Sequence, residues 1–481
     1  MRAAGRLAAV AAGAWLAWAA PATGAPTIRT DPPLKPKFAA SMPDYTVRCH
    51  TGSPVKLRVD PPDGARAAVD GGKAHAAPFS ASADLTPGRA VEVRVRGERR
   101  TRRYRVRCLP PDFPRWAARR AGRPQASWYV VTANRRVDLP GYAIVFDAHG
   151  VPVWWTGGTP GPWNADVLPN GHLVWTDSVG RSPSAPPFRE VTLDGRVVRT
   201  FATVGTPTNQ HDLQLLPNGN ALMISYTRRD GVDLSRWDGP RRASVLDGEI
   251  QEVDPAGHVV WRWNTRDHVA LRESSHWLRA AAIRVPDTAG GTLYDLVHLN
   301  SVARSGDLVV FSARYLDAVY AIDRATGSIA WKLGGTQTPR SLELRGDPLA
   351  SRDFGGQHDA RILDGGRTLT VYDNGTSWKR DPRALELRLD PERRRARLVR
   401  SIEFPLAGRS SCCGSARLLA GGDWVVSWGH TPWLTEQTSS GRLVLGLRLP
   451  QGYASYRMVP VPEGVLSRRA LADGMDSMSG R

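Results

Sequence analysis

The 481-residue chain lacks several features that would assign it to a common class of protein. No apolar run approaches the roughly 20 residues that a membrane-spanning helix requires. No glycine-rich phosphate loop followed by Lys-Ser or Lys-Thr is present, so no nucleotide donor is indicated. Its 4 cysteines include no Cys-x-x-Cys motif, which disfavours a zinc site. The dispersed 47 Gly and 37 Pro residues instead suit a turn-rich all-β protein.

The formal charge of +19 comes mostly from arginine. These arginines are dispersed and not clustered with aromatic residues, so we expect no nucleic-acid partner. The local run at 393–397 is interpreted as a solvated hairpin. A positive field of this size can still draw anionic substrates toward a cleft.

The N-terminus resembles an export signal. Arg2 and Arg6 precede an apolar stretch from Leu7 to Ala20, which ends in a small-x-small cleavage pattern at residues 20–22. We therefore expect residues 1–22 to be a cleaved signal peptide, and the mature protein to be secreted or extracytoplasmic without a stable membrane span. An uncleaved anchor is the alternative, although the stretch is short for one.

The cysteines fit export into an oxidising compartment. Cys49 and Cys108 each end a Tyr-x-Val-Arg-Cys pattern that alternates as a strand does, and a disulfide between them is expected. Cys412 and Cys413 are adjacent, and form either a vicinal disulfide or two buried thiols.

Turn residues divide the rest of the chain. Residues 37–110 show short alternating segments between Pro-Pro-Asp-Gly and Thr-Pro-Gly turns, which predict a small β-sandwich-like domain. A proline-rich linker is expected over 111–124, a catalytic domain over 125–460 and a C-terminal tail over 461–481.

The large domain is repetitive. An apolar strand, a turn like Pro-Asn-Gly and a second apolar strand recur with turns at 169–171, 217–219, 304–306, 364–366 and 420–422. A second motif alternates with it, in which a glycine turn leads into an apolar strand that often carries Trp. Two hairpins make a four-stranded blade, and six outer hairpins, with 391–397 counted, predict a six-bladed β-propeller. A β-sandwich array is the alternative, and Asp267–Ala282 is the best helix candidate in the domain.

The inner hairpins place histidines in register. The residues eight places before the turn glycines are Trp163, His211, His298, His358 and Gly414. The first strand of each blade lines the channel of a propeller, so equivalent positions converge on its axis. We therefore predict that three distant histidines form one cluster.

Pairing across the hairpins predicts the surroundings of this cluster. Because strands pair symmetrically about a turn, Arg314 is expected to be a cross-strand neighbour of His298, Asn374 to lie beside His358 and Thr227 to lie near His211. Asn300 should point the same way as His298, two residues earlier. Asp212 and Asp359 alternate to the other face, where a structural role is expected.

Three imidazoles and a guanidinium suit a compact oxyanion. Arginine offers a planar fork of donors, and histidine can act as donor, nucleophile or proton carrier near neutral pH. The expected site residues are thus His358, His298, His211 and Arg314 for catalysis, with Asn300, Asn374 and Thr227 for binding, and neither a metal nor another cofactor is expected.

Several motifs carry a family resemblance. Tyr294–Val302 resembles the histidine signature of bacterial arylsulfate sulfotransferases, and Phe311–Tyr315 resembles their arginine-bearing strand, with Tyr315 where histidine is usual. Four further matching segments fall in the same order: 211–219, 331–335, 357–360 and 373–375. The match spans about residues 125–460. That family is similar in having a β-sandwich before a six-bladed propeller.

The resemblance implies a mechanism and its substrates. His358 matches the family's nucleophile, which takes a sulfuryl group from an aryl sulfate and passes it to a phenol without a nucleotide donor. His211, His298, Asn300 and Arg314 match residues that bind the sulfate and handle protons. Two alternatives stay open: a propeller that binds an anionic ligand without turnover, and a metal-dependent hydrolase or lyase with three histidine ligands.

Overall fold

The computed structural model describes residues 24–50, 52–274, 277–280, 283–287, 290–349 and 354–480. The signal peptide expected at 1–22 lies outside these residues. The described part of the chain contains 35 strands and one α-helix, which confirms the all-β class.

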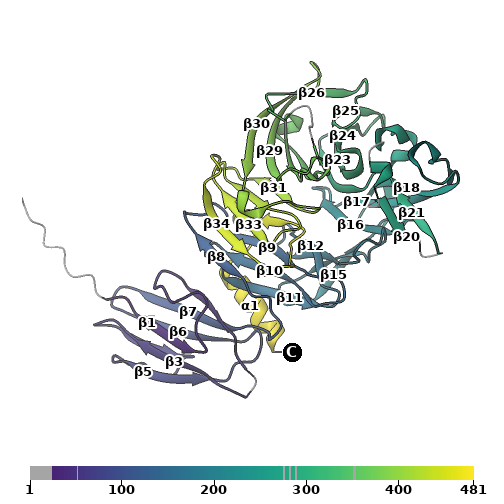
Figure 1. The fold of residues 1–481 in the computed structure, drawn as a ribbon. Helices are drawn as coiled ribbons and strands as arrows, with labels where there is room; N and C mark the ends of the chain where they lie inside the picture. The colour runs from purple at the N-terminus through teal and green to yellow at the C-terminus, as the bar shows by residue number, and fades with distance from the viewer. Residues whose placement is uncertain are drawn as a thin grey trace, which may run out of the picture.

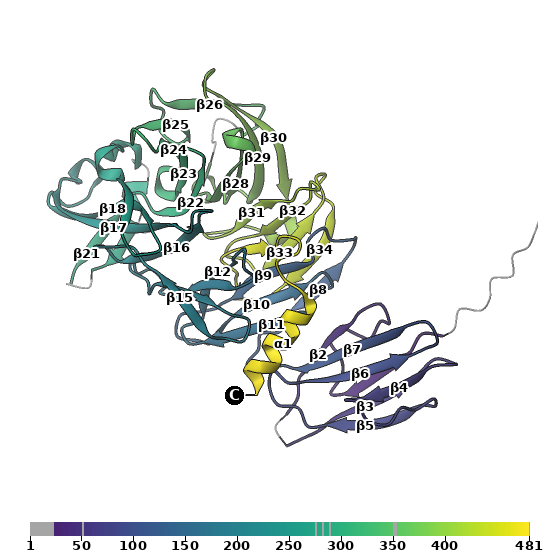
Figure 2. The same cartoon turned by 180° about the vertical axis from the view of Figure 1, so that it is seen from behind.

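Seven strands before residue 110 form two sheets (Figures 1 and 2). The smaller sheet contains, in spatial order, β1 (Thr27–Asp31), β3 (Val55–Asp60) and β5 (Phe79–Ala83). The larger contains β2 (Asp44–Val47), β7 (Thr101–Cys108), β6 (Ala90–Arg96) and β4 (Arg66–Val69). Alternate valines of β3 and β6 are buried in one shared core, as period-2 burial requires. The region begins at β1, earlier than the expected residue 37.

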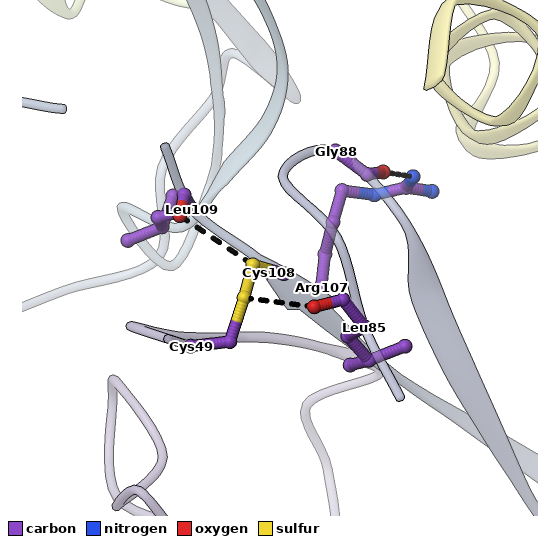
Figure 3. The surroundings of a disulfide bond; sticks show 6 residues. All are labelled: Cys49, Leu85, Gly88, Arg107, Cys108 and Leu109. Atoms are coloured by element: carbon purple, nitrogen blue, oxygen red, sulfur yellow. Dashed lines mark hydrogen bonds between the residues drawn. A yellow bond between two sulfur atoms is a disulfide. The ribbon is translucent and has the colours of Figure 1, made fainter. Parts of the chain in front are cut away.

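The expected disulfide is present in this region. Cys49 and Cys108 are bonded, with their Cα atoms 5.6 Å apart, and both are buried (Figure 3). The bond joins the end of β7 to the segment that follows β2, and these two strands run parallel as neighbours. It therefore ties together two strands that are far apart in the sequence.

The larger region is built from six four-stranded antiparallel arrays. The strands of the first three arrays are, from the inner strand outward, β35 (Met458–Pro460), β9 (Trp128–Ala133), β10 (Gly141–Asp147) and β11 (Pro152–Gly158); β12 (Pro162–Val167), β13 (Leu173–Asp177), β14 (Phe188–Val191) and β15 (Val197–Phe201); and β16 (Thr208–Leu215), β17 (Ala221–Val232), β18 (Ala243–Val253) and β19 (Val259–Asn264). The strands of the other three are β22 (Leu299–Ser305), β23 (Leu308–Ala313), β24 (Ala318–Asp323) and β25 (Ile329–Gly334); β27 (His358–Leu363), β28 (Thr368–Asp373), β29 (Arg383–Asp390) and β30 (Arg395–Glu403); and β31 (Ser415–Leu418), β32 (Trp424–Ser427), β33 (Trp433–Gln437) and β34 (Leu443–Arg448).

The inner strands close into a ring. The first strand of each array contacts the first strand of the next, in the cyclic order β35, β12, β16, β22, β27 and β31. The C-terminal β35 pairs with the N-terminal β9, so the two ends of the region meet in one sheet. Figure 1 shows β12, β16 and β31 toward the middle of this region, and β11, β26 (Ser341–Arg345) and β34 toward its rim.

The turn glycines explain the repeated hairpin motif. Gly171 and Gly219 end the two Pro-Asn-Gly turns with φ of +81° and +84°, a left-handed conformation that favours glycine. The strands that follow these turns bury β-branched and aromatic residues: the first four residues of β13 and the first six of β17 are buried. The motif thus marks where the chain reverses between two buried strands.

Additional strands extend these arrays. β8 (Ala117–Arg120) pairs with β34, so the segment expected to be a linker contains an edge strand. β20 (Arg284–Pro286) and β21 (Thr292–Asp295) extend the third array, and β26 joins the fourth array to the fifth through parallel pairs.

The α-helix is not where it was expected. The described residues of Asp267–Ala282 form only short 3-10 turns, in part because Trp277 and Leu278 are buried in an irregular connection. The α-helix, α1 (Arg468–Ser479), lies instead in the C-terminal tail and begins at an N-cap, Ser467. It packs on β11, and Figure 2 shows it between the two regions. Arg107 of β7 pairs with its Asp476 at 2.7 Å, which links α1 to the N-terminal region.

Candidate active site

A cavity of about 310 Å³ opens where the inner strands meet. Four of the five positions aligned in the sequence line it: Trp163, His211, His298 and His358. At the fifth position, a Cβ on Gly414 would come within 2.3 Å of the Tyr372 ring, so only glycine fits there. The repeat register therefore brings together side chains from four different arrays.

His358 is the most enclosed of the histidines, with 2% of its surface exposed. Its Nδ1 lies 2.7 Å from Asn374 Oδ1 and 3.0 Å from the Gly356 carbonyl, two acceptors that hold the ring proton on Nδ1. Nε2 is then the unprotonated nitrogen, and it accepts the Cys413 amide at 3.2 Å. Burial, and next the positive charge of Arg314, lower the pKa of His358 well below its usual value. The ring is therefore neutral near pH 7, with its lone pair on Nε2.

Arg314 is held in place beside His298 and over aromatic rings. Its backbone amide donates to the His298 carbonyl at 3.0 Å, as the hairpin register predicts. Its guanidinium carbon lies 5.0 Å from the Trp277 ring centroid and 5.1 Å from that of Tyr315. Nη2 donates to the Ser411 carbonyl at 2.6 Å, whereas the buried Nε has no hydrogen-bond partner among the described residues. Arg314 therefore keeps donor capacity for an anion in the cavity.

The other two histidines contact each other, with ring centroids 4.7 Å apart. His298 directs Nδ1 to the Asp295 carboxylate at 2.6 Å, and its φ of +49° is part of an irregularity at the start of β22. His211 directs Nδ1 to Asn209 Oδ1. Burial, and next the neighbouring His298 and His358, lower the pKa of His211 well below its usual value.

The expected binding residues have different environments. Asn374 contacts His358 directly, as expected. Asn300 is fully buried and does not line the cavity; its side chain donates to the carbonyl of Gln357 at 2.7 Å, and its Oδ1 has no partner among the described residues.

The predicted placement of Thr227 near His211 is wrong. The hairpin of β16 and β17 is offset by two residues from the assumed symmetry about Gly219, since Leu213 pairs with Met223, and an irregularity between Thr208 and Leu213 follows at His211. Thr227 pairs with Asp247 in β18 and accepts a hydrogen bond from Asn264 at 2.9 Å. It lines a second hollow of about 660 Å³ that shares Tyr226 and Leu246 with the histidine cavity.

The two aspartates that follow the histidines meet on the other side of the inner strands. Asp212 lies 2.5 Å from Arg457 Nη1 and 3.0 Å from Arg361 Nη2. Asp359 lies 2.8 Å from Arg417 and 2.9 Å from Arg361. These five residues form a buried ionic cluster, in which the arginines hold the pKa of both carboxyl groups below their usual value against the effect of burial.

Sequence reasoning missed much of the cavity wall, including Tyr456, Cys412 and Cys413. Tyr456, just before β35, lines the cavity 5.8 Å from the His211 ring and 6.5 Å from the His358 ring. Its strand closes the ring from the far end of the chain, so it has no hairpin motif on which to align it. Cys412 and Cys413 also line the cavity, and their only sequence signal was their adjacency.

The cavity wall suits an aromatic ring. Beyond the histidines and Arg314, six aromatic and aliphatic side chains line it, Trp163, Tyr226, Leu246, Val285, Tyr315 and Tyr456, together with polar ones that include Arg181, Asn209, Gln210 and Asp295. A neutral imidazole and a guanidinium thus share a pocket with several apolar side chains, an arrangement that can hold an aromatic compound carrying an anionic group. Within the described ranges, no three His, Cys, Asp or Glu side chains are grouped so that they could hold a metal ion.

A family model for arylsulfotransferase (ASST) matches residues 183–449. This chain belongs to that family. The matched range contains all three histidines of the cavity and Arg314, whereas Trp163 and Tyr456 lie outside it. None of the curated proteins searched matches this chain.

Several solved structures are similar to this chain at low sequence identity. A protein of unknown function from Bacteroides caccae is 14% identical, with a TM-score of 0.42, over 70% of this chain and 100% of its own. The periplasmic gluconolactonase of Pseudomonas aeruginosa is 13% identical, with a TM-score of 0.38, over 69% of this chain and 100% of its own. An inactive variant of virginiamycin B lyase from Staphylococcus aureus is 9% identical, with a TM-score of 0.34, over 68% of this chain and 87% of its own.

In the part of the chain that the structure describes, no helix has the length and hydrophobicity needed to cross a membrane.

Proposed function

We propose that the protein transfers a sulfuryl group from an aryl sulfate to a phenol through a covalent intermediate on His358. The observation that carries this proposal is the hydrogen bonding of His358, which leaves Nε2 unprotonated at the cavity that Arg314 also lines. Family membership supports aryl sulfuryl transfer in general. The hydrogen bonds argue for this histidine as the nucleophile.

The first half of the reaction forms a sulfohistidine. His358 Nε2 attacks the sulfur, the bond from sulfur to the aryl oxygen breaks, and the phenolate leaves. Arg314 Nε and the amide of Cys413, released from Nε2 as that atom attacks, can donate to the sulfuryl oxygens. Phenol has a pKa of about 10, so the departing phenolate needs only one proton, which His298 or His211 can supply.

The second half reverses these steps with the acceptor. The oxygen of a phenol attacks the sulfur, the bond from sulfur to Nε2 breaks, and the phenol proton passes to the same histidine that served as the acid. Asp295, 2.6 Å from Nδ1 of His298, orients that ring so that its Nε2 can take the proton. Asn374 keeps the His358 ring in one orientation during both halves.

The same proposal covers the architecture and the site of action. We interpret the six arrays as the blades of a six-bladed propeller, preceded by a β-sandwich-like domain, because their inner strands contact one another in a closed cycle. The buried disulfide between Cys49 and Cys108 supports an oxidising, extracytoplasmic location.

The test uses an aryl sulfate donor and a phenol acceptor with the full chain. The His358→Asn variant is expected to lose about a thousandfold in rate or more, whereas His258→Asn, which changes an exposed histidine outside the cavity, keeps the wild-type rate. The wild-type enzyme, quenched after mixing with donor alone, should carry an acid-labile sulfuryl group on His358. Full activity in His358→Asn would remove this residue as nucleophile, and binding of donor without phenol release would indicate a binding protein.

A further inference from the structure

Two adjacent thiols lie against the proposed nucleophile and have no role in the mechanism above. Cys412 and Cys413 line the histidine cavity, with their Sγ atoms 2.7 Å apart. Both are free, Cys413 is buried, and Cys412 is partly exposed, so small reagents can reach it.

The segment that carries these thiols is bonded to both nitrogens of His358. The Cys413 amide donates to Nε2 at 3.2 Å. Asn374, which accepts from Nδ1, donates in turn to the Cys413 carbonyl at 3.0 Å. A change in the backbone at Cys413 is therefore transmitted directly to the ring of His358.

The segment is also tied to the anion-binding arginine and packed closely from outside. The Ser411 carbonyl accepts from Arg314 at 2.6 Å, and the Cys412 carbonyl accepts from the His430 amide at 2.9 Å. A Cβ on Gly429 would lie 2.5 Å from the Cys412 carbonyl, so the loop between β32 and β33 approaches as closely as a glycine allows. This packing keeps the two sulfur atoms side by side.

We infer that Cys412 and Cys413 form a reversible vicinal disulfide, and that its state controls binding of the anionic donor at the site of the proposed function. Two S–H bonds break and one S–S bond forms, while a small disulfide such as oxidised glutathione accepts the two electrons and two protons and becomes two thiols. Family membership and the proposed mechanism do not require this bond, so it is an additional property of the site.

The reduced pair opposes the donor through its charge. The hydrogen bond from Cys413, and next the charges of His430 and Arg314, lower the pKa of Cys412, whereas the same hydrogen bond and burial raise the pKa of Cys413. A thiolate is thus favoured at Cys412, beside the cavity that must accept a sulfate. Oxidation removes this negative charge and leaves Arg314 free to attract the donor.

The bond is expected to be easily reduced. Consecutive Cα atoms are about 3.8 Å apart across a trans peptide, which is less than the 4.4 to 6.8 Å that unstrained disulfides span. Cys49 and Cys108, with Cα atoms 5.6 Å apart, lie within that range and provide an internal comparison. A graded reductant should therefore open the bond between Cys412 and Cys413 first.

The test measures the bond and the activity separately. The full chain is treated with oxidised glutathione or with dithiothreitol, unfolded, alkylated with iodoacetamide and digested. After oxidation, the peptide with both residues should lack two hydrogens and resist alkylation; after mild reduction it should carry two alkyl groups while Cys49 and Cys108 remain bonded. Full alkylation of Cys412 and Cys413 after oxidation would overturn the disulfide.

Kinetics then test control of the site. The KM for the aryl sulfate should rise about tenfold on reduction of the wild type and return on reoxidation. Cys412→Ser and Cys413→Ser should each give one KM in both conditions, since either change removes the bond. Equal wild-type KM in the two states would overturn the control, and a bond without any sulfuryl transfer would refute only the proposed function.

Discussion

The two faces of the inner strands carry different arrangements of charge, although neighbouring residues of the chain form them. His211, His358 and Tyr456 line the cavity, and the next residue in each case, Asp212, Asp359 or Arg457, enters the buried ionic cluster. The cavity face has three histidines and two arginines, of which Arg314 keeps a buried Nε without a hydrogen-bond partner among the described residues, whereas the charges of the opposite face are paired with one another. Each of these cavity side chains is thus held in position because the residue that follows it in the chain is fixed by ion pairs in the cluster.

The largest expected effect on stability comes from a substitution in the ionic cluster. Arg457 lies 2.5 Å from Asp212 and 3.2 Å from Asp359, with 2% of its side chain exposed. Arg457→Met leaves both carboxylates buried with one cation fewer, and the free energy of unfolding should fall by about 3 to 5 kcal/mol. Urea unfolding followed by tryptophan fluorescence measures this change.

A surface arginine provides the matched control for this effect. Arg393 is 75% exposed and pairs only with Asp390 among the described residues, so Arg393→Met should leave the urea midpoint unchanged. If Arg457→Met unfolded at the wild-type urea midpoint, the ionic cluster would not stabilise the inner strands that line the cavity.

The sequence predicted one of these faces much better than the other. The histidines and Arg314 share a hairpin register, and a register is visible wherever each strand is followed by the same turn. The cluster depends on Arg361, Arg417 and Arg457, which follow no common spacing from the aspartates they bind. Contacts of this kind depend on how the arrays are arranged around the axis, and no single hairpin contains that information.

Local irregularities limited the sequence prediction in a second way. Arg314 lies opposite His298 only because β22 and β23 shift by one residue between Leu299 and Ser301; the register nearer the turn would place Tyr315 there. The prediction fails at His211 because β16 and β17 pair two residues away from the assumed register from the turn onward, Leu213 with Met223, and an irregularity follows between Thr208 and Leu213. Such shifts leave no mark in the alternation of apolar residues, so they could not be predicted.

On the cavity face, the largest remaining effect is expected at Arg314. Arg314→Lys keeps the charge but loses the planar fork that reaches both Ser411 and a bound oxyanion. The kcat/KM for an aryl sulfate should fall about 30-fold, equivalent to about 2 kcal/mol, with no change in the urea midpoint. Wild-type kcat/KM in this variant would exclude Arg314 from the anion site, and a large loss of stability would place it with the cluster instead.

The pH dependence of stability should also differ between the two faces. Burial lowers the pKa of both His211 and His358, so near pH 6.5 and below the unfolded chain binds protons that the folded chain does not. The free energy of unfolding should therefore fall as the pH drops below about 6.5, by up to about 1.4 kcal/mol per pH unit for each histidine. The carboxylates of the cluster lose stability only at lower pH, because their folded pKa values are depressed.

Urea midpoints at several pH values between 7.5 and 5 measure this slope. His211→Asn should give a shallower slope than the wild type, whereas His258→Asn, at a side chain that is 77% exposed, should keep it. The same slope in His211→Asn as in the wild type would mean that this ring is already protonated in the folded protein.

The smallest expected effects are on kcat, and they test where Asn374 and Thr227 lie relative to the histidines. Asn374 contacts His358 at 2.7 Å, and Asn374→Ala should lower kcat about tenfold, because the ring proton loses the nearer of its two acceptors. Thr227 contacts Asn264 in the neighbouring hollow instead, so Thr227→Ala should change kcat for a small phenol by less than about twofold. Steady-state kinetics with one donor and one acceptor measure both. A tenfold loss in Thr227→Ala would show that β16 and β17 pair symmetrically in the working enzyme, and that Thr227 does reach His211.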